Sequence, residues 1–422
     1  MTGTKNESFK HSYESKHAQH NGSIKNIIVL GAGYGGLTAA LRLEKLLRNL
    51  PQYQIHLIDR HPYHTIKTQL HEAAVRKTEV TIPIDRILRN RKIIFHLGKL
   101  TKIDSNNQIL QIGEKMLRFD YLIIAIGSKV NYYSIPGVER YSFPLQTFDN
   151  AESIYNHISN MFALAASESN FDKRNEMLCF VIGGGGLAGV EFAGELHDQV
   201  HIKLKNYNIP SDECEIIIIE LANRIVPSME EGFSIRVYKE LTDKGIKIKT
   251  GSKIIERTEN TVALLNGEIL KTKTLIWTGG IKISSLLHEG GIKTAINGRI
   301  IVDRYLRASD YPFIYAIGDN SLAINPKTGN AMTPAAQFAL QQGRLVANNI
   351  FAEITGRNRL EYIPKVLGEV VSLGRHLAIG WIALPLLKKV TFAGFLISLL
   401  KTAIGEKHIL LLRKESRNWI RV

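Results

Sequence analysis

The sequence predicts an α/β chain with two Rossmann-like units and an amphipathic segment toward its C-terminal end. Two observations predict this class. An apolar run, a glycine-rich turn and a helical pattern follow one another twice, about 150 residues apart, and each copy leads to a second apolar run that ends in an acid. These runs are continuous rather than alternating, which is typical of a parallel sheet buried on both faces. The length of 422 residues allows two or three domains.

The first copy begins with the apolar run at residues 27–30 and continues into a G-x-G-x-x-G fingerprint. Gly31 permits the tight turn, Gly33 lets the backbone approach a pyrophosphate, and Gly36 lets the helix pack closely on the strand. The N-terminus of that helix offers unpaired N–H groups to the phosphates. Asp59 ends the next strand, where a carboxylate can accept a hydrogen bond from a ribose hydroxyl. The residues expected to bind this dinucleotide are Gly31, Ala32, Gly33, Tyr34, Gly35, Gly36, Asp59 and Arg60.

The second copy has the same order of elements, with its fingerprint at residues 184–189. Its next strand ends in Glu220, 31 residues beyond Gly189. A carboxylate there favours NADH over NADPH, because it accepts from the ribose diol and repels a 2′-phosphate. Arg224, four residues further on, leaves the preference open. The residues expected to bind NADH are Gly184, Gly186, Gly189 and Glu220.

Two dinucleotide sites in one chain indicate a redox pair, with a resident flavin in one site and a diffusing nicotinamide in the other. Hydride transfer is the reaction class that follows. We therefore expect FAD as the cofactor and NADH as the co-substrate. We expect no metal site, because the 14 histidines are scattered. His11, His17 and His20 fall in a polar N-terminal tail that we expect to be disordered.

Three short segments resemble motifs of the two-dinucleotide-binding flavoprotein superfamily. Residues 120–127 resemble the strand that returns from the FAD domain, and residues 278–280 resemble its copy at the end of the NADH domain. Residues 315–319 resemble the second FAD motif, whose Asp contacts the ribityl–phosphate side of FAD. In that superfamily the first fingerprint binds FAD and the second binds NAD(P)H. The resemblance adds Ala125, Gly127, Gly318 and Asp319 to the FAD residues, and Gly279 and Gly280 to the NADH residues.

Within the superfamily, the chain is most similar to the type II NADH dehydrogenases, which are single-chain NADH:quinone oxidoreductases. Three local matches carry this resemblance: residues 189–196, residues 334–337 with Gln341, and residues 368–375. The resemblance implies that NADH reduces FAD and that a quinone reoxidises it. We expect no proton pumping, because the sequence contains no run of 18 apolar residues that could form a transmembrane helix. It implies catalytic roles for Glu191, Gln337 and Gln341, and it adds Ala336 and Gln337 to the FAD residues and Glu191 to the NADH residues.

These catalytic residues each have a structural alternative. Glu191 lies near a helix N-terminus, where the dipole favours a carboxylate, and Glu195 follows it on the same face. Gln337 and Gln341 are also four residues apart, and the alternative for them is a polar pair on an exposed helix face.

The cysteines exclude several relatives. Cys179 and Cys214 are the only two, and they form neither a C-x-x-C nor a C-x-x-x-x-C pair. Disulphide reductases need such a pair, and sulfide:quinone oxidoreductases use a cysteine pair placed elsewhere in the chain. Soluble ferredoxin reductases of this superfamily lack the C-terminal segment.

That C-terminal segment is strongly basic. Residues 365–422 contain ten Lys or Arg and three Asp or Glu, and so supply seven of the net charge of +15. A basic amphipathic helix with aromatic residues is typical of an interfacial membrane anchor, and a dimer-interface or core helix is the alternative. The apolar stripe of the expected helix consists of Phe392, Phe395, Leu396, Leu399 and Leu400.

We predict a quinone-reducing enzyme attached peripherally to the cytoplasmic face of the cell membrane, with a homodimer left open. One rival passes electrons to another acceptor. A second rival is a flavin-based redox sensor that binds nucleic acid, which is disfavoured because the basic charge concentrates in an apolar-rich stretch. The predicted regions are a disordered tail (1–23), an FAD domain (24–150 and 296–355), an NADH domain (151–295) and a membrane-associating segment (356–422).

Overall fold

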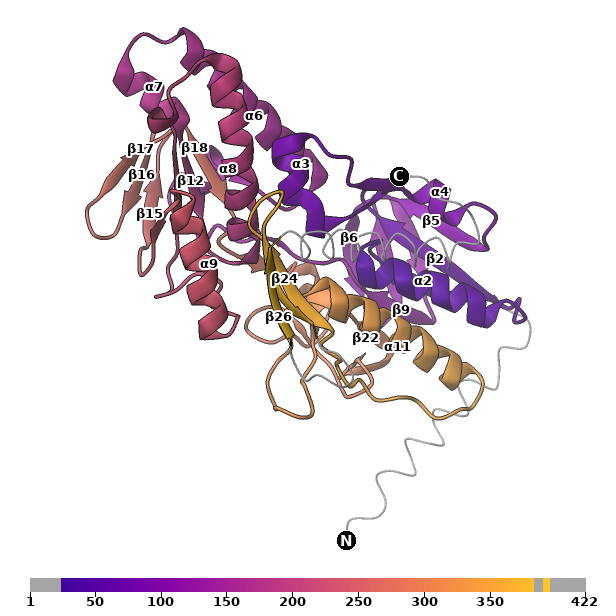
Figure 1. Cartoon of the computed structure of the whole chain (residues 1–422). Helices are drawn as coiled ribbons and strands as arrows, with labels where there is room; N and C mark the ends of the chain where they lie inside the picture. Colours follow the sequence, from indigo (N-terminus) through magenta and orange to yellow (C-terminus); the bar gives the residue numbers. More distant parts are fainter. Residues whose placement is uncertain (1–23, 383–389, 395–422) are drawn as a thin grey trace.

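The computed structural model describes residues 24–382 and 390–394. A six-stranded sheet, in the order β21-β22-β9-β1-β2-β5, forms the centre of the first unit (Figure 1). Strand β1 is parallel to both of its neighbours, with Ile27 opposite Ile55 on one side and Tyr121 on the other. The strands are β1 (Lys25–Leu30), β2 (Tyr53–Asp59), β5 (Ile93–Leu97), β9 (Tyr121–Ile124), β21 (Arg307–Ala308) and β22 (Tyr311–Ala316). Because β22 pairs with β9, the sheet is completed by residues that follow the second unit in the sequence.

One face of this sheet is covered by α2 (Tyr34–Leu47) and α11 (Ala336–Ile354), which pack against each other (Figure 1). Helix α2 buries the apolar stripe that its sequence predicts, including Leu37, Ala40 and Leu41. The helix starts directly after the glycine turn, so the turn and the N-terminus of α2 lie at the carboxyl end of β1.

The other face carries a second core. Ile28 and Leu122 of the large sheet pack there with Leu287 and Ile292, so residues that the predicted NADH domain contains contribute to the core of the first unit. The elements on this face are α10 (Leu286–Glu289) and the antiparallel strands β6 (Leu100–Asp104), β7 (Ile109–Ile112) and β8 (Lys115–Arg118).

The second unit is built on a five-stranded parallel sheet in the order β11-β18-β12-β13-β14. Its strands are β11 (Phe143–Pro144), β12 (Cys179–Gly183), β13 (Glu215–Ile219), β14 (Lys247–Lys249) and β18 (Thr274–Trp277). Its helices are α6 (Phe148–Ser167), α7 (Phe171–Leu178), α8 (Leu187–Tyr207) and α9 (Glu231–Asp243). A small antiparallel sheet of β15 (Ile254–Arg257), β16 (Thr261–Leu264) and β17 (Ile269–Lys271) packs on it. The predicted α/β architecture is therefore present twice.

The described C-terminal residues form a three-stranded antiparallel sheet of β24 (Gly368–Ser372), β25 (Ala378–Ile382) and β26 (Val390–Gly394). The predicted amphipathic helix is wrong for Phe392, which lies in β26 opposite Gly380. Val390 and Thr391 are β-branched, and pairing with β25 outweighs the short helical periodicity. The other residues of the predicted stripe, Phe395, Leu396, Leu399 and Leu400, and the predicted tail at 1–23 lie outside the described residues.

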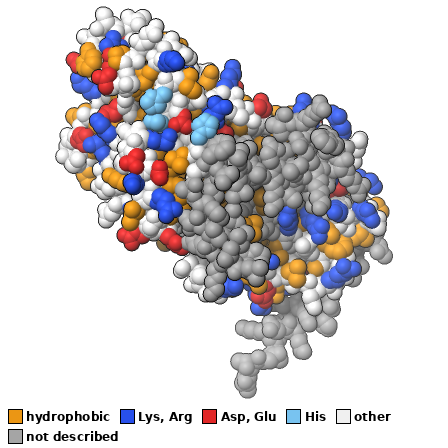
Figure 2. Space-filling model, viewed as in Figure 1, with side chains coloured by type: hydrophobic (Ala, Val, Ile, Leu, Met, Phe, Trp, Pro, Cys, Tyr) orange, Lys and Arg blue, Asp and Glu red, His pale blue; other side chains and the backbone are white. Residues whose placement is uncertain are grey.

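Across the described ranges, no helix has both the length and the apolar character needed to cross a bilayer. On the face shown in Figure 2, basic and acidic side chains are mixed over the second unit, whereas basic ones are more frequent around α2 and α11.

Candidate functional site

The two glycine turns have the same backbone geometry. Gly31 and Gly184 both adopt left-handed backbone conformations, with φ of 99° and 115°. A side chain at Gly31 would also collide with the carbonyl oxygen of Ala125, and one at Gly184 would lie 2.8 Å from Gly279. These contacts place Ala125 and Gly279, from the two returning strands, directly beside the turns. Each turn is therefore fixed by its neighbouring strand as well as by its own sequence.

The remaining glycines of each fingerprint divide into two kinds. A Cβ added at Gly33 or Gly186 would meet nothing within 4 Å, so the backbone is open there to a ligand. A Cβ at Gly36 would lie 1.9 Å from the carbonyl oxygen of Gly31, and one at Gly189 would lie 2.0 Å from that of Gly184. The last glycine of each copy thus allows the helix to pack closely on the turn.

The two predicted acids also occupy equivalent positions. Asp59 Oδ2 accepts a hydrogen bond of 2.6 Å from the N–H of Ala32, and Glu220 Oε2 accepts one of 2.6 Å from the N–H of Gly185. The second oxygen of each carboxylate accepts from the backbone two residues further on. Each carboxylate is held beside its glycine turn and keeps lone pairs that a ribose hydroxyl can use.

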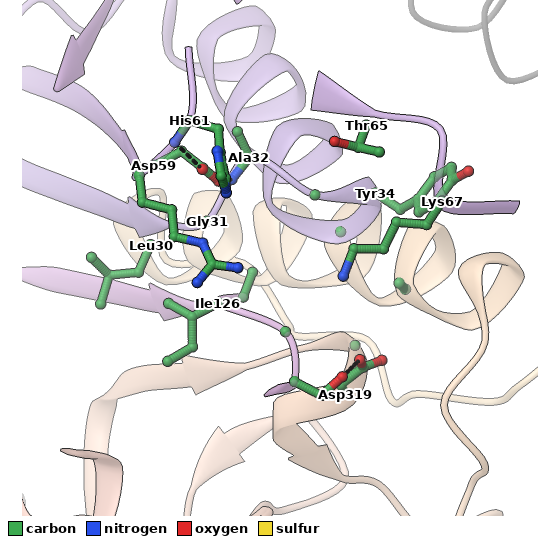
Figure 3. A pocket seen from close by; sticks show the side chains of 18 of the residues that line it. Leu30, Gly31, Ala32, Tyr34, Asp59, His61, Thr65, Lys67, Ile126 and Asp319 are labelled. Atoms are coloured by element: carbon green, nitrogen blue, oxygen red, sulfur yellow. Dashed lines mark hydrogen bonds between the residues drawn. The ribbon is translucent and has the colours of Figure 1, made fainter. Parts of the chain in front are cut away.

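The first turn opens into a cleft of about 490 Å³ (Figure 3). Helices α2 and α11 both begin at this cleft, and neither N-terminus is capped by a side chain. Two sets of unpaired N–H groups are therefore available to phosphate or carbonyl oxygens. The predicted residues that line the cleft are Gly31, Ala32, Gly33, Tyr34, Gly35, Asp59, Arg60, Ala125, Gly127, Gly318, Asp319 and Ala336.

Lys67 is a cleft residue that sequence reasoning missed. Its side chain reaches into the cleft from one side and Asp319 from the other (Figure 3). Burial lowers the pKa of Lys67, and the charge of Asp319 opposes that shift. Lys67 begins a 3₁₀ helix of three residues (Lys67–Gln69), which is too short to give a periodicity or a motif, so the sequence offers no signal for it.

Asp319 is held by groups that were also not predicted. Ser128 Oγ donates a hydrogen bond of 2.7 Å to Asp319 Oδ2. The neighbouring Asn320 side chain accepts from the N–H of Gly127 and donates to its carbonyl oxygen. These bonds join residues almost 200 positions apart. The cleft therefore combines an open glycine turn, two helix N-termini, a lysine and an oriented carboxylate, a set that fits a dinucleotide with two phosphates.

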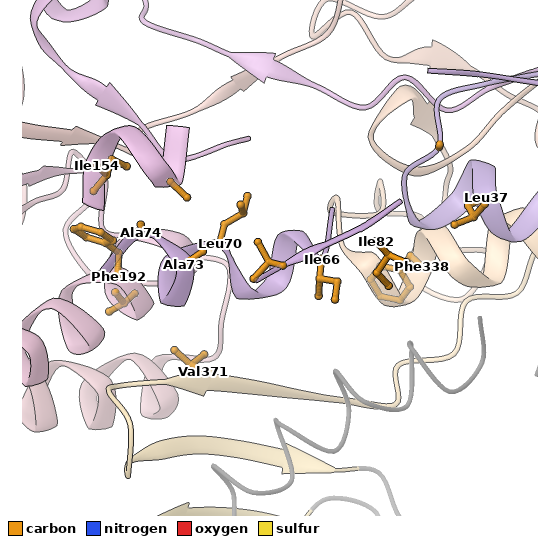
Figure 4. Packing of buried hydrophobic residues seen from close by; sticks show 14 of the residues in the cluster. Leu37, Ile66, Leu70, Ala73, Ala74, Ile82, Ile154, Phe192, Phe338 and Val371 are labelled. Carbon is orange, nitrogen blue, oxygen red and sulfur yellow. The ribbon is translucent and has the colours of Figure 1, made fainter. Parts of the chain in front are cut away.

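Helix α3 (Leu70–Arg76) lies between the two units. Its Ala73 and Ala74 pack beside Ile154 of α6 and Phe192 of α8, and Val371 of β24 lies below them (Figure 4). The small alanine side chains permit this close approach of several elements. An element of the first unit is thereby built into the core of the second.

Glu191 projects from α8 toward this junction. Its Oε1 accepts a hydrogen bond of 3.2 Å from the N–H of Ser372, and its Oε2 lies 3.8 Å from His71 Nδ1. Glu195, one turn further along α8, is 1% exposed and forms an ion pair with Arg76. Both glutamates therefore contact α3 and the C-terminal sheet.

Gln337 and Gln341 are not among the residues that line the cleft, and their side-chain amides bond instead to the backbone of residues 365–368. Gln337 accepts from the N–H of Leu367 and donates to the carbonyl oxygen of Gly368. Gln341 makes the same pair of bonds with Lys365, at 2.9 and 2.8 Å. The two amides thus hold residues 365–368 against α11. Their predicted contact with flavin or quinone stays a prediction.

Cys179 begins β12 and Cys214 directly precedes the neighbouring strand β13, and neither residue lines the cleft. Burial raises the pKa of the Cys179 thiol to about 12, and burial also raises that of Cys214. A raised pKa disfavours the thiolate, which is the reactive form in redox exchange.

Comparison with known proteins identifies relatives over most of the chain. Residues 25–343 match the pyridine nucleotide-disulphide oxidoreductase family. The type II NADH:quinone oxidoreductase of Staphylococcus saprophyticus is 30% identical over 366 residues, which cover 84% of this chain and 89% of the relative. The protein of the same name from Staphylococcus aureus is 30% identical, with 85% and 90% covered.

Solved structures share the fold. NDH2 from Plasmodium falciparum superposes with a TM-score of 0.81 at 20% identity, covering 94% of this chain and 99% of the other. The sulfide:quinone oxidoreductase of Aquifex aeolicus superposes with a TM-score of 0.76 at 21% identity, with 93% and 92% covered.

Proposed function

The chain belongs to the pyridine nucleotide-disulphide oxidoreductases and, within them, to the type II NADH:quinone oxidoreductases, and from this premise we propose that it oxidises NADH and reduces a quinone with FAD bound in the cleft. The observation that carries the proposal is the repeated fingerprint. Two glycine turns of equal geometry, each with its acid, provide one site for a resident dinucleotide and one for a diffusing dinucleotide.

The cleft residues fit FAD. When bound, FAD supplies the ability to accept a hydride and release its two electrons to a second substrate. The open backbone at Gly33 and the N-terminus of α2 would hold the pyrophosphate, and Asp59 would accept from the adenosine ribose. Asp319 would hold the ribityl side, and Lys67 would add a positive charge inside the cleft.

The second turn would hold NADH. Gly186 is open to the pyrophosphate, Gly279 lies next to the turn, and Gly280 follows it in the chain. Glu220 would accept from the ribose diol and repel the 2′-phosphate of NADPH. Arg224 donates to the carbonyl oxygen of Pro227, which gives its guanidinium a partner within its own loop.

For the quinone reaction we assign Glu191 as the group that delivers a proton, supported by its place at the junction of α8, α3 and β24. We assign Gln337 and Gln341 to the same side of the cleft, where they would orient the quinone or the flavin edge directly or by holding residues 365–368.

We extend the proposal to location and domain division. The basic C-terminal segment, 356–422, would attach the chain to the cytoplasmic face of the cell membrane, and the basic side chains around α2 and α11 support contact with an anionic surface (Figure 2). A homodimer contact is the alternative use of that segment. For the rest of the chain we propose an FAD domain formed by residues 24–150 and 296–355 and an NADH domain formed by residues 151–295.

One experiment tests the central proposal. The purified chain is examined for a flavin spectrum, and NADH and NADPH oxidation are compared with and without a soluble quinone analogue. We expect bound FAD and NADH oxidation that depends on quinone. A colourless protein, or a reduced flavin that quinone does not reoxidise, would refute it.

A further inference from the structure

The imidazole of His71 lies between two carboxylates. His71 Nε2 is 3.8 Å from Glu72 Oε1, and His71 Nδ1 is 3.8 Å from Glu191 Oε2. Each ring nitrogen therefore faces its own acid, one on α3 and the other on α8. A histidine in this arrangement can receive a proton at one nitrogen and release another from the opposite nitrogen.

Burial changes along this row of groups. The Glu72 side chain is 23% exposed, whereas the His71 side chain is 4% exposed and that of Glu191 is 14% exposed. Glu72 can exchange protons with water, whereas His71 is buried. The neighbouring residues of its helix, Ala73 and Ala74, pack against α6 and α8 (Figure 4). The row therefore passes from the more exposed Glu72, through the buried His71, to Glu191, which accepts from the N–H of Ser372.

The proposed reaction requires such a supply. NADH brings two electrons and one proton, and quinol contains two added electrons and two added protons. The balanced equation, NADH + H⁺ + quinone → NAD⁺ + quinol, takes one proton from solvent in each turnover. A positioned acid–base chain can supply that proton.

We propose that Glu72, His71 and Glu191 form a relay that carries this proton from solvent to the quinone. The inference rests on the proposed function, in which Glu191 is the terminal donor. Protonated Glu72 gives its proton to His71 Nε2, and His71 gives the proton on Nδ1 to the Glu191 carboxylate. The imidazole then carries its proton on Nε2, and proton exchange with water restores the Nδ1–H tautomer while Glu72 takes up a new proton from solvent. Each separation of 3.8 Å exceeds hydrogen-bond length, so each pair must close by about 1 Å during transfer.

Other charged groups lie around the row formed by Glu72, His71 and Glu191. Arg76 on α3 pairs with Glu195 on α8 and lies within electrostatic range of Glu72. Asp198 on α8 and Arg375 after β24 also act on Arg76, and Asp198 accepts from the N–H of Arg375. Because the relay contacts α3, α8 and β24, it is assembled only when both units and the C-terminal sheet are in place.

The test separates the two half-reactions by rapid mixing. In His71→Ala, anaerobic flavin reduction by NADH should stay within about twofold of wild type, and reoxidation by quinone should slow at least about tenfold. Glu72→Gln should slow reoxidation less than His71→Ala does. Its effect should be larger at higher pH, because the proton concentration in solvent is lower there. Added imidazole should restore reoxidation in His71→Ala, because it fills the vacated site and replaces the missing base.

A matched control and a binding readout accompany this test. His157 is another partly buried imidazole, bonded to Thr274 in the second unit, and His157→Ala should gain nothing from imidazole. Imidazole should raise the unfolding temperature of His71→Ala but not that of His157→Ala, which reports occupancy without reference to activity. If His71→Ala does not fold, the reoxidation rate of Glu72→Gln alone decides whether the relay operates, because this side chain is 23% exposed and its replacement should be tolerated.

The relay would be overturned if reoxidation were unchanged in His71→Ala, or in Glu72→Gln when that variant decides alone, or if imidazole accelerated the His157 control equally. The proposed function fails by a different result, since wild-type protein would then not reduce quinone at all.

Discussion

Replacing Gly36 by alanine tests whether close helix packing, rather than ligand contact, explains the last glycine of the fingerprint. The added Cβ would lie 1.9 Å from the carbonyl oxygen of Gly31, against a closest normal approach of about 3.0 Å. The start of α2 must therefore move by about 1 Å relative to a turn that Ala125 already confines. Overpacking of this size costs about 1–3 kcal/mol, and the backbone partner places Gly36→Ala at the upper end.

The assay is unfolding of the flavin-free protein, by urea and by heat. A loss of about 3 kcal/mol corresponds to a fall of about 6–12 °C in the unfolding temperature of a unit of this size. Gly33→Ala is the matched control, because a Cβ there meets nothing within 4 Å. Its unfolding free energy should change by less than about 1 kcal/mol, the cost of a poorer helix cap, whereas its FAD affinity should fall at least about tenfold because the methyl group blocks the pyrophosphate.

The second unit provides an internal repeat of this comparison. Gly186→Ala should raise the KM for NADH and leave FAD content unchanged, and Gly189→Ala should destabilise the protein as Gly36→Ala does. The reasoning is refuted if Gly36→Ala is as stable as wild type, or if Gly33→Ala keeps full FAD affinity.

Three further predictions concern other parts of the molecule. Glu220→Gln should shift the ratio of NADH to NADPH efficiency by about tenfold toward NADPH, since a repulsive charge is removed, and steady-state kinetics with both nucleotides would contradict this if the ratio held. Burial, with the charges of His96 and Lys115, lowers the pKa of His56 from 6.5 to about 4. The stability from neutral His56 is therefore present above pH 6.5 and lost as pH falls toward 4, about 2 kcal/mol by pH 5. The free energy of unfolding in urea, measured above pH 6.5 and at pH 5, should show this loss in wild type and not in His56→Asn. Gln341→Ala removes two hydrogen bonds to Lys365 and should loosen residues 365–368 by about 1–2 kcal/mol. Faster tryptic cleavage after Lys365 would be the readout, and an unchanged rate would count against the holding role.

The sequence predicts most of what is local in this fold. Each fingerprint determines its own turn, because the spacing of three glycines sets the backbone conformation, the ligand approach and the helix packing together. The acids Asp59 and Glu220 are likewise predictable, since a strand of known length ends beside the turn.

Groups brought together over long distances are not predictable in the same way. Lys67 and Asn320 lie in 3₁₀ helices of three residues and Ser128 in a loop, and their roles arise from contacts with residues far away in the chain. His71 meets Glu191 only because α3 is enclosed by the second unit.

The C-terminal error has a related cause. The helical spacing of apolar residues around Phe392 predicts a helix, whereas in the structure β26 pairs with β25. That pairing is a tertiary interaction, which a short stretch of sequence does not reveal.

The discontinuous first sheet also has a consequence for synthesis of the protein. Strand β9 emerges from the ribosome about 190 residues before β22, its neighbour in the finished sheet. At ordinary translation rates the edge of β9 stays without its partner for about 10–40 s, while the whole second unit is made. An apolar strand edge exposed for that time is a site for aggregation. The nascent chain should therefore depend on chaperones during this interval, and FAD can be acquired only after residues near 340 have been added.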